Sequence, residues 1–201
     1  MSALTVDPPT AQGHEWDDVV RIWEETDAPE GCKVEIIEGI VTVSPTPTNS
    51  HNSIAAKVQR RLYTVIPEDW GIYQTLAVAI PSRLGMFIPD LVVAPESVLD
   101  EPGNYIPATA TAAELVVEIT SKSNATHDRV EKLNGYAAAG VPLYLLIDSW
   151  HVGRPTATLY GEPKNATYHV LDVVKFGDRI HLPAPFDLTI DTGEFPVPPL
   201  R

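Results

Sequence analysis

The chain has a single cysteine, Cys32, in 201 residues. One thiol cannot form a disulfide within the chain and gives no cysteine spacing for a metal site, so a disulfide-stapled secreted domain is excluded and a reducing compartment is expected. No run approaches the roughly 18 consecutive apolar residues of a membrane-spanning helix. Residues 1–18 have neither a basic start nor an apolar segment, which argues against a signal peptide. We therefore expect a cytoplasmic protein without a membrane partner.

Basic residues are also scarce, since 14 Lys and Arg face 27 Asp and Glu for a formal net charge of −13. A protein that binds nucleic acid by charge attraction alone is expected to be basic, so this simple class is disfavoured. An acidic protein can act on DNA where divalent metal ions and a local basic patch offset its carboxylates. The sequence further lacks the G-x-S-x-G element of hydrolases, a phosphate-binding loop, G-x-G-x-x-G and H-E-x-x-H.

What is present indicates a globular chain, because 44% of its residues are hydrophobic. A length of 201 residues suffices for one domain with a core that needs no disulfide or structural metal. We expect a flexible N-terminal arm at 1–12, a single domain at 13–190 and a Pro-rich C-terminal tail at 191–201.

Residues 113–148 contain the clearest pattern of the sequence. Leu115–Ile119 and Leu143–Ile147 are apolar with little alternation, as expected for strands buried on both faces. Between them, Thr126–Ala139 is predicted to be a helix with Thr126 as its N-cap, and Gly140 follows its end. Strand, helix and strand with short links predict an α/β fold (α+β mixed), in which helices flank a central mixed sheet and extra short strands are added. The other elements we expect are a helix at Trp16–Glu25, a hairpin at Val34–Val43 with its turn at Glu38-Gly39, a helix from Asn49 or Ser50 to about Ile66, strands at Gly71–Ile80 and Met86–Val93, an irregular loop at Glu96–Thr111, and short strands at Thr156–Tyr160, Thr167–Lys175, Arg179–Leu182 and Asp187–Ile190.

Two carboxylates are set into apolar strands: Glu118 within Leu115–Ile119, and Asp90 directly after Pro89. A buried carboxylate carries a large desolvation penalty unless it is paired or binds a metal ion. A salt bridge to Lys or Arg would explain either residue alone, whereas two carboxylates with the same placement favour a shared site. Carboxylates on neighbouring strands can hold Mg²⁺ (or Mn²⁺) with water in the remaining positions. A lysine close to that ion could orient or deprotonate the attacking water.

The order Pro-Asp, Glu and Lys is that of the PD-(D/E)xK nuclease motif, and longer segments make the resemblance more specific. The segments VEIIEGIVTVSPTPTNSH, FIPDLVVAP and ELVVEITSKSN…DRVEKLNGYAAAGVPLYLLID resemble the Uma-two family, from about Val34 to Tyr160. The resemblance implies a restriction-endonuclease-like nuclease with a twisted mixed sheet flanked by helices, dependence on a divalent metal, and often a homodimer. It assigns Asp90 and Glu118 to the metal. Glu38 and His51 match the acidic residue and the following His of the family's opening segment, and they would line the site.

The lysine departs from the motif, because the position two residues after Glu118 holds Thr120. Lys132, on the following helix, is the matching position in the resemblance, and Lys122 is the alternative carrier. Two plainer interpretations remain open. Asp128 and Lys132 are four residues apart, so Lys132 could form a helix-surface ion pair. His51 could be a capping or surface residue.

The sequence thus favours a Mg²⁺-dependent endonuclease that hydrolyses DNA, in which Lys132 acts on the water. The rival from another class is a non-catalytic dimeric scaffold or partner-binding protein that keeps the fold, which the displaced lysine and the charge of −13 both support. A carboxylate-based hydrolase of another substrate fits the acidic residues but has no substrate signal.

Overall fold

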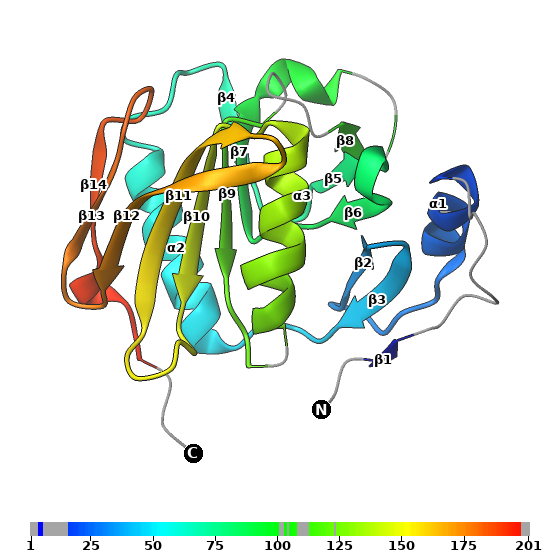
Figure 1. Ribbon diagram of the computed structural model, residues 1–201, viewed down its shortest axis with the longest axis horizontal. Coiled ribbons are helices and arrows are strands. Elements are labelled where there is room, and N and C mark those ends of the chain that lie inside the picture. The colour runs from blue at the N-terminus through cyan, green and yellow to red at the C-terminus, as the bar shows by residue number, and fades with distance from the viewer. Residues whose placement is uncertain are drawn as a thin grey trace.

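The computed structural model describes residues 4–5, 16–100, 103, 105–107, 113–122 and 124–197, and these build two six-stranded sheets and one small hairpin (Figure 1). Leu4–Thr5, within the predicted N-terminal arm, form strand β1, which pairs antiparallel with β3 (Ile40–Ser44). The rest of the predicted arm (1–12) and residues 198–201 of the predicted tail lie outside the described residues. None of the described helices is long and apolar enough to cross a membrane.

The predicted strand–helix–strand unit lies in one of these sheets, here termed the central sheet, with strand order β12-β11-β10-β9-β7-β4. Its strands β9 (Leu115–Ile119) and β10 (Leu143–Asp148) run parallel, and the other neighbouring pairs are antiparallel. The mixed sheet flanked by helices is thereby confirmed. The remaining strands of the central sheet are β4 (Trp70–Tyr73), β7 (Leu91–Pro95), β11 (Thr156–Lys164) and β12 (Thr167–Lys175).

Helices cover both faces of the central sheet. The odd-numbered residues of β9 pack in the same core cluster as helix α2 (Asn49–Leu62), whereas Val116 packs in the cluster that contains Tyr136 of helix α3 (Lys132–Ala139). Successive side chains of a strand point to opposite faces, so Glu118 shares the face of Val116. Its carboxylate therefore points toward α3.

The second sheet has the order β1-β3-β2-β6-β5-β8, and helix α1 (Trp16–Glu25) packs against β2 and β3. The predicted hairpin is confirmed, because β2 and β3 pair antiparallel and both turn residues, Glu38 and Gly39, have positive φ. Its other strands are β2 (Lys33–Ile37), β5 (Ala77–Ile80), β6 (Gly85–Phe87) and β8 (Tyr105–Pro107).

Two predicted strands are each divided between the two sheets. Gly71–Ile80 was expected to be one strand, but β4 belongs to the central sheet and β5 to the second sheet. Met86–Val93 is likewise split into β6 and β7 around Ile88-Pro89-Asp90. Proline has no N–H and cannot continue a strand ladder. The chain leaves the second sheet after Phe87 and enters the central sheet at Leu91, two residues after Pro89. Asp90 consequently lies at the junction of the two sheets.

The helix boundaries differ from the expected ones. Helix α2 is capped by Thr48 and not by Asn49 or Ser50, because the Thr48 side chain accepts a hydrogen bond from the His51 N–H. The helix ends at Leu62, before the predicted end at about Ile66. The helix after β9 opens with a π-helical segment, His127–Glu131, before α3. Thr126 makes no side-chain capping bond, so its predicted N-cap role is wrong, while Ser121 Oγ accepts from the Asn124 N–H one turn earlier.

The C-terminal strands β13 and β14 form the small hairpin, which packs beside α2 and closes that face of the core (Figure 1). The predicted irregular loop contains a short helix and strand β8. The remaining elements are the 3₁₀ helices η1 (Pro81–Arg83), η2 (Glu96–Leu99) and η4 (Thr192–Glu194), and the strands β13 (Arg179–Leu182) and β14 (Leu188–Asp191).

Candidate active site

Asp90 lies beside Glu118 because of the register of two neighbouring strands. Leu91 of β7 is opposite Val117 of β9 in an antiparallel ladder, so the next pair of positions is Asp90 and Glu118. The Ile119 N–H donates to Asp90 Oδ2 at 2.8 Å, which fixes the carboxylate against β9. Side chains at opposite positions of such a ladder have Cβ atoms about 5 Å apart. The structure therefore brings the two carboxylates together.

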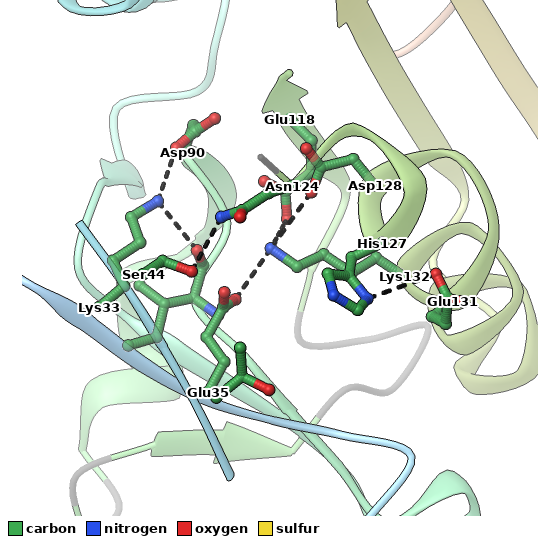
Figure 2. Close-up of polar contacts among 12 residues, drawn as sticks. Lys33, Glu35, Ser44, Asp90, Glu118, Asn124, His127, Asp128, Glu131 and Lys132 are labelled. Atoms are coloured by element: carbon green, nitrogen blue, oxygen red, sulfur yellow. Dashed lines mark hydrogen bonds and ion pairs between the residues drawn. The ribbon is translucent and has the colours of Figure 1, made fainter. Parts of the chain in front are cut away.

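Lys132 reaches the same place from α3. Its Nζ lies 3.0 Å from Glu118 Oε1, 2.9 Å from Glu35 Oε1 and 3.5 Å from Asp128 Oδ1 (Figure 2). The Tyr136 hydroxyl, one helical turn further, also donates to Glu118 Oε1 at 3.1 Å. Lys132 and Asp128 are each only 4% exposed, so the interpretation of this pair as a helix-surface ion pair is wrong. The lysine and the strand carboxylate meet although the motif's position holds Thr120.

His51 and Lys33 contact the other carboxylate. His51 Nε2 lies 2.8 Å from Asp90 Oδ2, and Lys33 Nζ donates to Asp90 Oδ1 at 2.6 Å. His51 stands at the start of α2 with its side chain largely buried, so a surface role is wrong for its ring. Its backbone N–H does donate to the Thr48 side chain that caps the helix.

Sequence reasoning missed Lys33 and Glu35 and selected Glu38 instead. Glu35 Oε1 accepts from the Ile88 N–H at 2.7 Å, next to the proline that interrupts the strand, and its carboxylate faces Lys132. Glu38 lies in the hairpin turn, where its partly exposed carboxylate binds Arg83, and the structure does not bring it into the site. The sequence signal that could have found them is the spacing of Lys33 and Glu35, because residues two positions apart on a strand lie on the same face.

The site residues line a cavity of about 820 Å³ between the two sheets, which α2 and α3 also border. Lys122, the alternative lysine, lines this cavity at some distance from the carboxylates, with its Nζ 5.9 Å from the centre of the Trp150 ring. Asp128 and Tyr136 are two further contributors that the sequence pattern did not single out.

A protein-family model described as "Putative restriction endonuclease" matches residues 16–193. The chain belongs to the Uma2 family. Among solved structures, the Uma2 chain is similar to the crystal structure of "a putative nuclease belonging to DUF820" from Anabaena variabilis, with a TM-score of 0.65 and 18% identity over 91% of this chain and 97% of that one. At this identity the likeness shows the fold alone. No curated protein matches the chain.

Electrostatics differ sharply between the two carboxylates of this Uma2 site. Burial raises the pKa of Glu118 to about 8 and that of Asp128 to about 7, because the nearby Lys132 charge offsets only part of the desolvation. Burial also opposes ionisation of Asp90, but Lys33 and His51 hold the pKa of this carboxyl below its usual range. Near neutral pH, Asp90 is therefore ionised, whereas Glu118 favours its protonated form and Asp128 is close to the midpoint of its titration.

The Lys132 ammonium is held in its charged form. Burial alone would lower its pKa, but Glu118, Glu35 and Asp128 together raise this pKa well above its ordinary value. Lys132 therefore keeps its proton at neutral pH and can donate hydrogen bonds to a water or a phosphate oxygen. It does not act as a base in this state.

Carboxylate oxygens are the ligand type that Mg²⁺ takes in proteins. Four buried carboxyl groups, on Glu35, Asp90, Glu118 and Asp128, face the ammonium groups of Lys33 and Lys132, so negative charge exceeds positive charge once Glu118 and Asp128 lose their protons. Among the described residues, no group of three or more His, Cys, Asp and Glu side chains is arranged to hold a metal ion. Asp90 and Glu118 could hold an ion that keeps several waters, as Mg²⁺ does.

The raised pKa of Glu118 predicts how pH affects stability without metal. The folded state favours the protonated carboxyl, so this contribution is full below the ordinary pKa of 4.5 and is lost as pH rises to about 8. We expect the unfolding free energy of the wild type to fall relative to Glu118→Gln across this range, and the difference to level off above it. Urea denaturation in EDTA measures it, and parallel curves would show that Glu118 is ionised throughout. The charged and titratable groups around Glu118 that both proteins retain are Lys132, Asp128, Asp90, Lys33, Glu35 and Tyr136.

Proposed function

We propose that this Uma2 protein is a divalent-metal-dependent endonuclease that hydrolyses DNA phosphodiester bonds. The observation that supports this most directly is the contact between Lys132 and Glu118 beside Asp90 in a cavity. These three residues correspond to the carboxylates and the lysine of the PD-(D/E)xK motif, with the lysine supplied by helix α3 in place of the strand. The family description and the likeness to a nuclease fold point the same way.

In this proposal Asp90 and Glu118 would hold Mg²⁺ or Mn²⁺. The bound ion would supply charge stabilisation at the phosphate and a more acidic water. Lys33 and the Ile119 N–H hold Asp90 in place, and His51 orients it from α2. Ion binding requires the ionised form of Glu118, so it displaces the proton that burial keeps there.

Lys132 would orient the attacking water and stabilise the negative charge that develops on the phosphate oxygens. Its ammonium is already desolvated and fixed by Glu35, so little reorganisation is needed during the reaction. Proton removal from the water then falls to another acceptor, such as a phosphate oxygen or a carboxylate. Because the net charge is −13, the protein's overall field repels DNA, and local contacts have to hold the substrate.

The rival proposal is a non-catalytic scaffold, and one observation favours it. Lys33 and Lys132 already pair with carboxylates in a buried network, which accounts for much of the buried charge without a metal ion. A homodimer is compatible with either function.

Metal binding and cleavage together test the proposed function. We expect millimolar Mg²⁺ or Mn²⁺ to raise the Tm of the wild type, because binding to the folded state stabilises it by about 2.7 kcal/mol at a hundredfold excess over Kd. The double variant Asp90→Asn with Glu118→Gln should lose this rise, and Asp90→Asn should lose DNA cleavage at low ionic strength. The control is Glu38→Gln, which removes a carboxylate outside the cavity and should change neither.

The rival would be favoured by a different pair of results. These are a wild type with no cleavage of single-stranded, double-stranded or branched DNA in either metal, and a full Tm shift in the double variant. The second result alone would place the ion elsewhere in the protein.

A further inference from the structure

Trp150 lies at the edge of the catalytic cavity, where a network of hydrogen bonds holds its backbone in place. It follows the end of β10, and its backbone N–H donates to Asp148 Oδ1 at 3.1 Å. Asp148 is in turn held by two bonds from Arg129, at 2.8 and 2.9 Å, and by the Thr120 hydroxyl at 3.0 Å. Two-bond arginine–carboxylate pairs are strong and fix orientation. Thr120, at the position of the motif's lysine, thus helps to place Trp150.

An aromatic face and a cation form this wall of the cavity. Trp150 is partly exposed, and the Lys122 ammonium lies 5.9 Å from the centre of its ring, within the range of a cation–π contact. Both residues line the cavity that contains Asp90 and Glu118. Indole rings are the side chains on which nucleobases stack in proteins that bind unpaired strands.

Two polar atoms beside this wall, Ser149 Oγ and Asn124 Oδ1, are buried and make no hydrogen bond within the described part of the chain. Both residues line the same cavity, and Ser149 is only 8% exposed. Buried polar groups are normally satisfied, so unsatisfied ones at a cavity wall indicate a ligand with complementary donors and acceptors. A hydroxyl and an amide oxygen match the polar edge of a base.

We propose that Trp150, Lys122, Ser149 and Asn124 form a subsite for an unpaired nucleobase of single-stranded DNA. The base stacks on Trp150, its edge bonds to Ser149 and Asn124, and Lys122 contacts the adjoining phosphate. Bases inside a duplex are stacked on one another and cannot reach such a platform. Stacking also provides affinity that does not depend on protein charge, which suits a chain of net charge −13. This inference rests on the proposed function, since it names the form of DNA that the cavity accepts.

Anisotropy of a short fluorescein-labelled oligothymidine, compared with a duplex of the same length, tests the subsite in EDTA and low salt. We expect the wild type to bind the single strand more tightly than the duplex. Trp150→Ala should weaken single-strand binding by about tenfold or more, the size of one lost stacking contact. Trp150→Phe should retain most of the affinity, because an aromatic face remains.

Two variants separate binding from folding. Ser149→Ala removes a hydroxyl that bonds to no other described residue, so it should leave the Tm unchanged and weaken single-strand binding. Tyr63→Ala removes an aromatic side chain that is 56% exposed and outside this cavity, and it should change neither.

Several results overturn the subsite. These are equal binding of single strand and duplex, no binding of the single strand, and folded Trp150→Ala and Ser149→Ala proteins that bind as the wild type does. Adding Mg²⁺ or Mn²⁺ separates the two proposals. Cleavage by a Trp150→Ala protein of unchanged affinity would keep the nuclease and reject the subsite. Trp150-dependent binding without cleavage would keep the subsite and reject the nuclease.

Discussion

Replacing Lys132 with alanine is expected to reduce the kcat of DNA cleavage by about 10²-fold or more, the usual size of one lost hydrogen-bond donor that stabilises charge in the transition state. Lys132 Nζ lies within 3.0 Å of both Glu118 and Glu35. Among the described residues, no other lysine forms an ion pair with Glu118. Asp90 keeps Lys33 and His51 in the variant, so metal binding should be largely retained. The rate is measured at saturating metal and DNA, at low ionic strength.

Lys132→Ala also has a structural cost that the assay has to separate from catalysis. Removing one partner of a buried ion pair costs about 3–5 kcal/mol, because the remaining charges lose their compensation. We expect Mg²⁺ to raise the Tm of the variant more than that of the wild type, since the ion replaces the missing positive charge. Near-UV circular dichroism establishes whether the variant is folded under the assay conditions.

Lys122→Ala is the matched control, because it removes a lysine from the same cavity without touching the carboxylates. It should leave kcat unchanged and weaken DNA binding, because Lys122 lies against the Trp150 ring and, in the proposed subsite, contacts a phosphate. A loss of kcat in Lys122→Ala with full activity in Lys132→Ala would assign the catalytic lysine to position 122.

The second large effect concerns the core of the central sheet. Leu145→Ala should lower the unfolding free energy by about 2–5 kcal/mol, the range for large-to-small changes at buried positions. Leu145 is 1% exposed and lies in β10 between Val117 of β9 and Leu159 of β11. Truncation leaves a cavity that neighbouring strands cannot close without breaking their pairing. Urea denaturation of the metal-free protein gives the free energy.

The same substitution at an exposed leucine provides the comparison. Leu171 in β12 is 40% exposed, so Leu171→Ala should cost less than about 1 kcal/mol. A similarly small loss for Leu145→Ala would contradict the placement of β10 inside the sheet.

Local sequence determined those parts of the molecule that depend on neighbouring residues. Leu115–Ile119 is a strand over the predicted range, because an apolar β-branched run has few alternatives to a buried strand. The hairpin turn at Glu38-Gly39 also follows from local chemistry, since glycine adopts positive φ at low cost. The sequence also predicted that Asp90 and Glu118 share a site, because both are carboxylates set into apolar strands.

Only the tertiary structure decided which other charges complete the site. Glu35 and Lys33 come from a strand of the second sheet, and their partners are 53 to 97 residues away in the sequence. The local pattern puts Lys33 and Glu35 on one face of β2, but it does not show what that face contacts. In the fold, Glu35 accepts from the Ile88 N–H and faces Lys132, whereas Glu38 lies in the hairpin turn and binds Arg83. The sequence determined β9, the hairpin turn and two of the carboxylates. The crossing of the chain between the two sheets determined which charged residues surround those carboxylates, because side-chain contacts across sheets depend on packing and not on spacing along the chain.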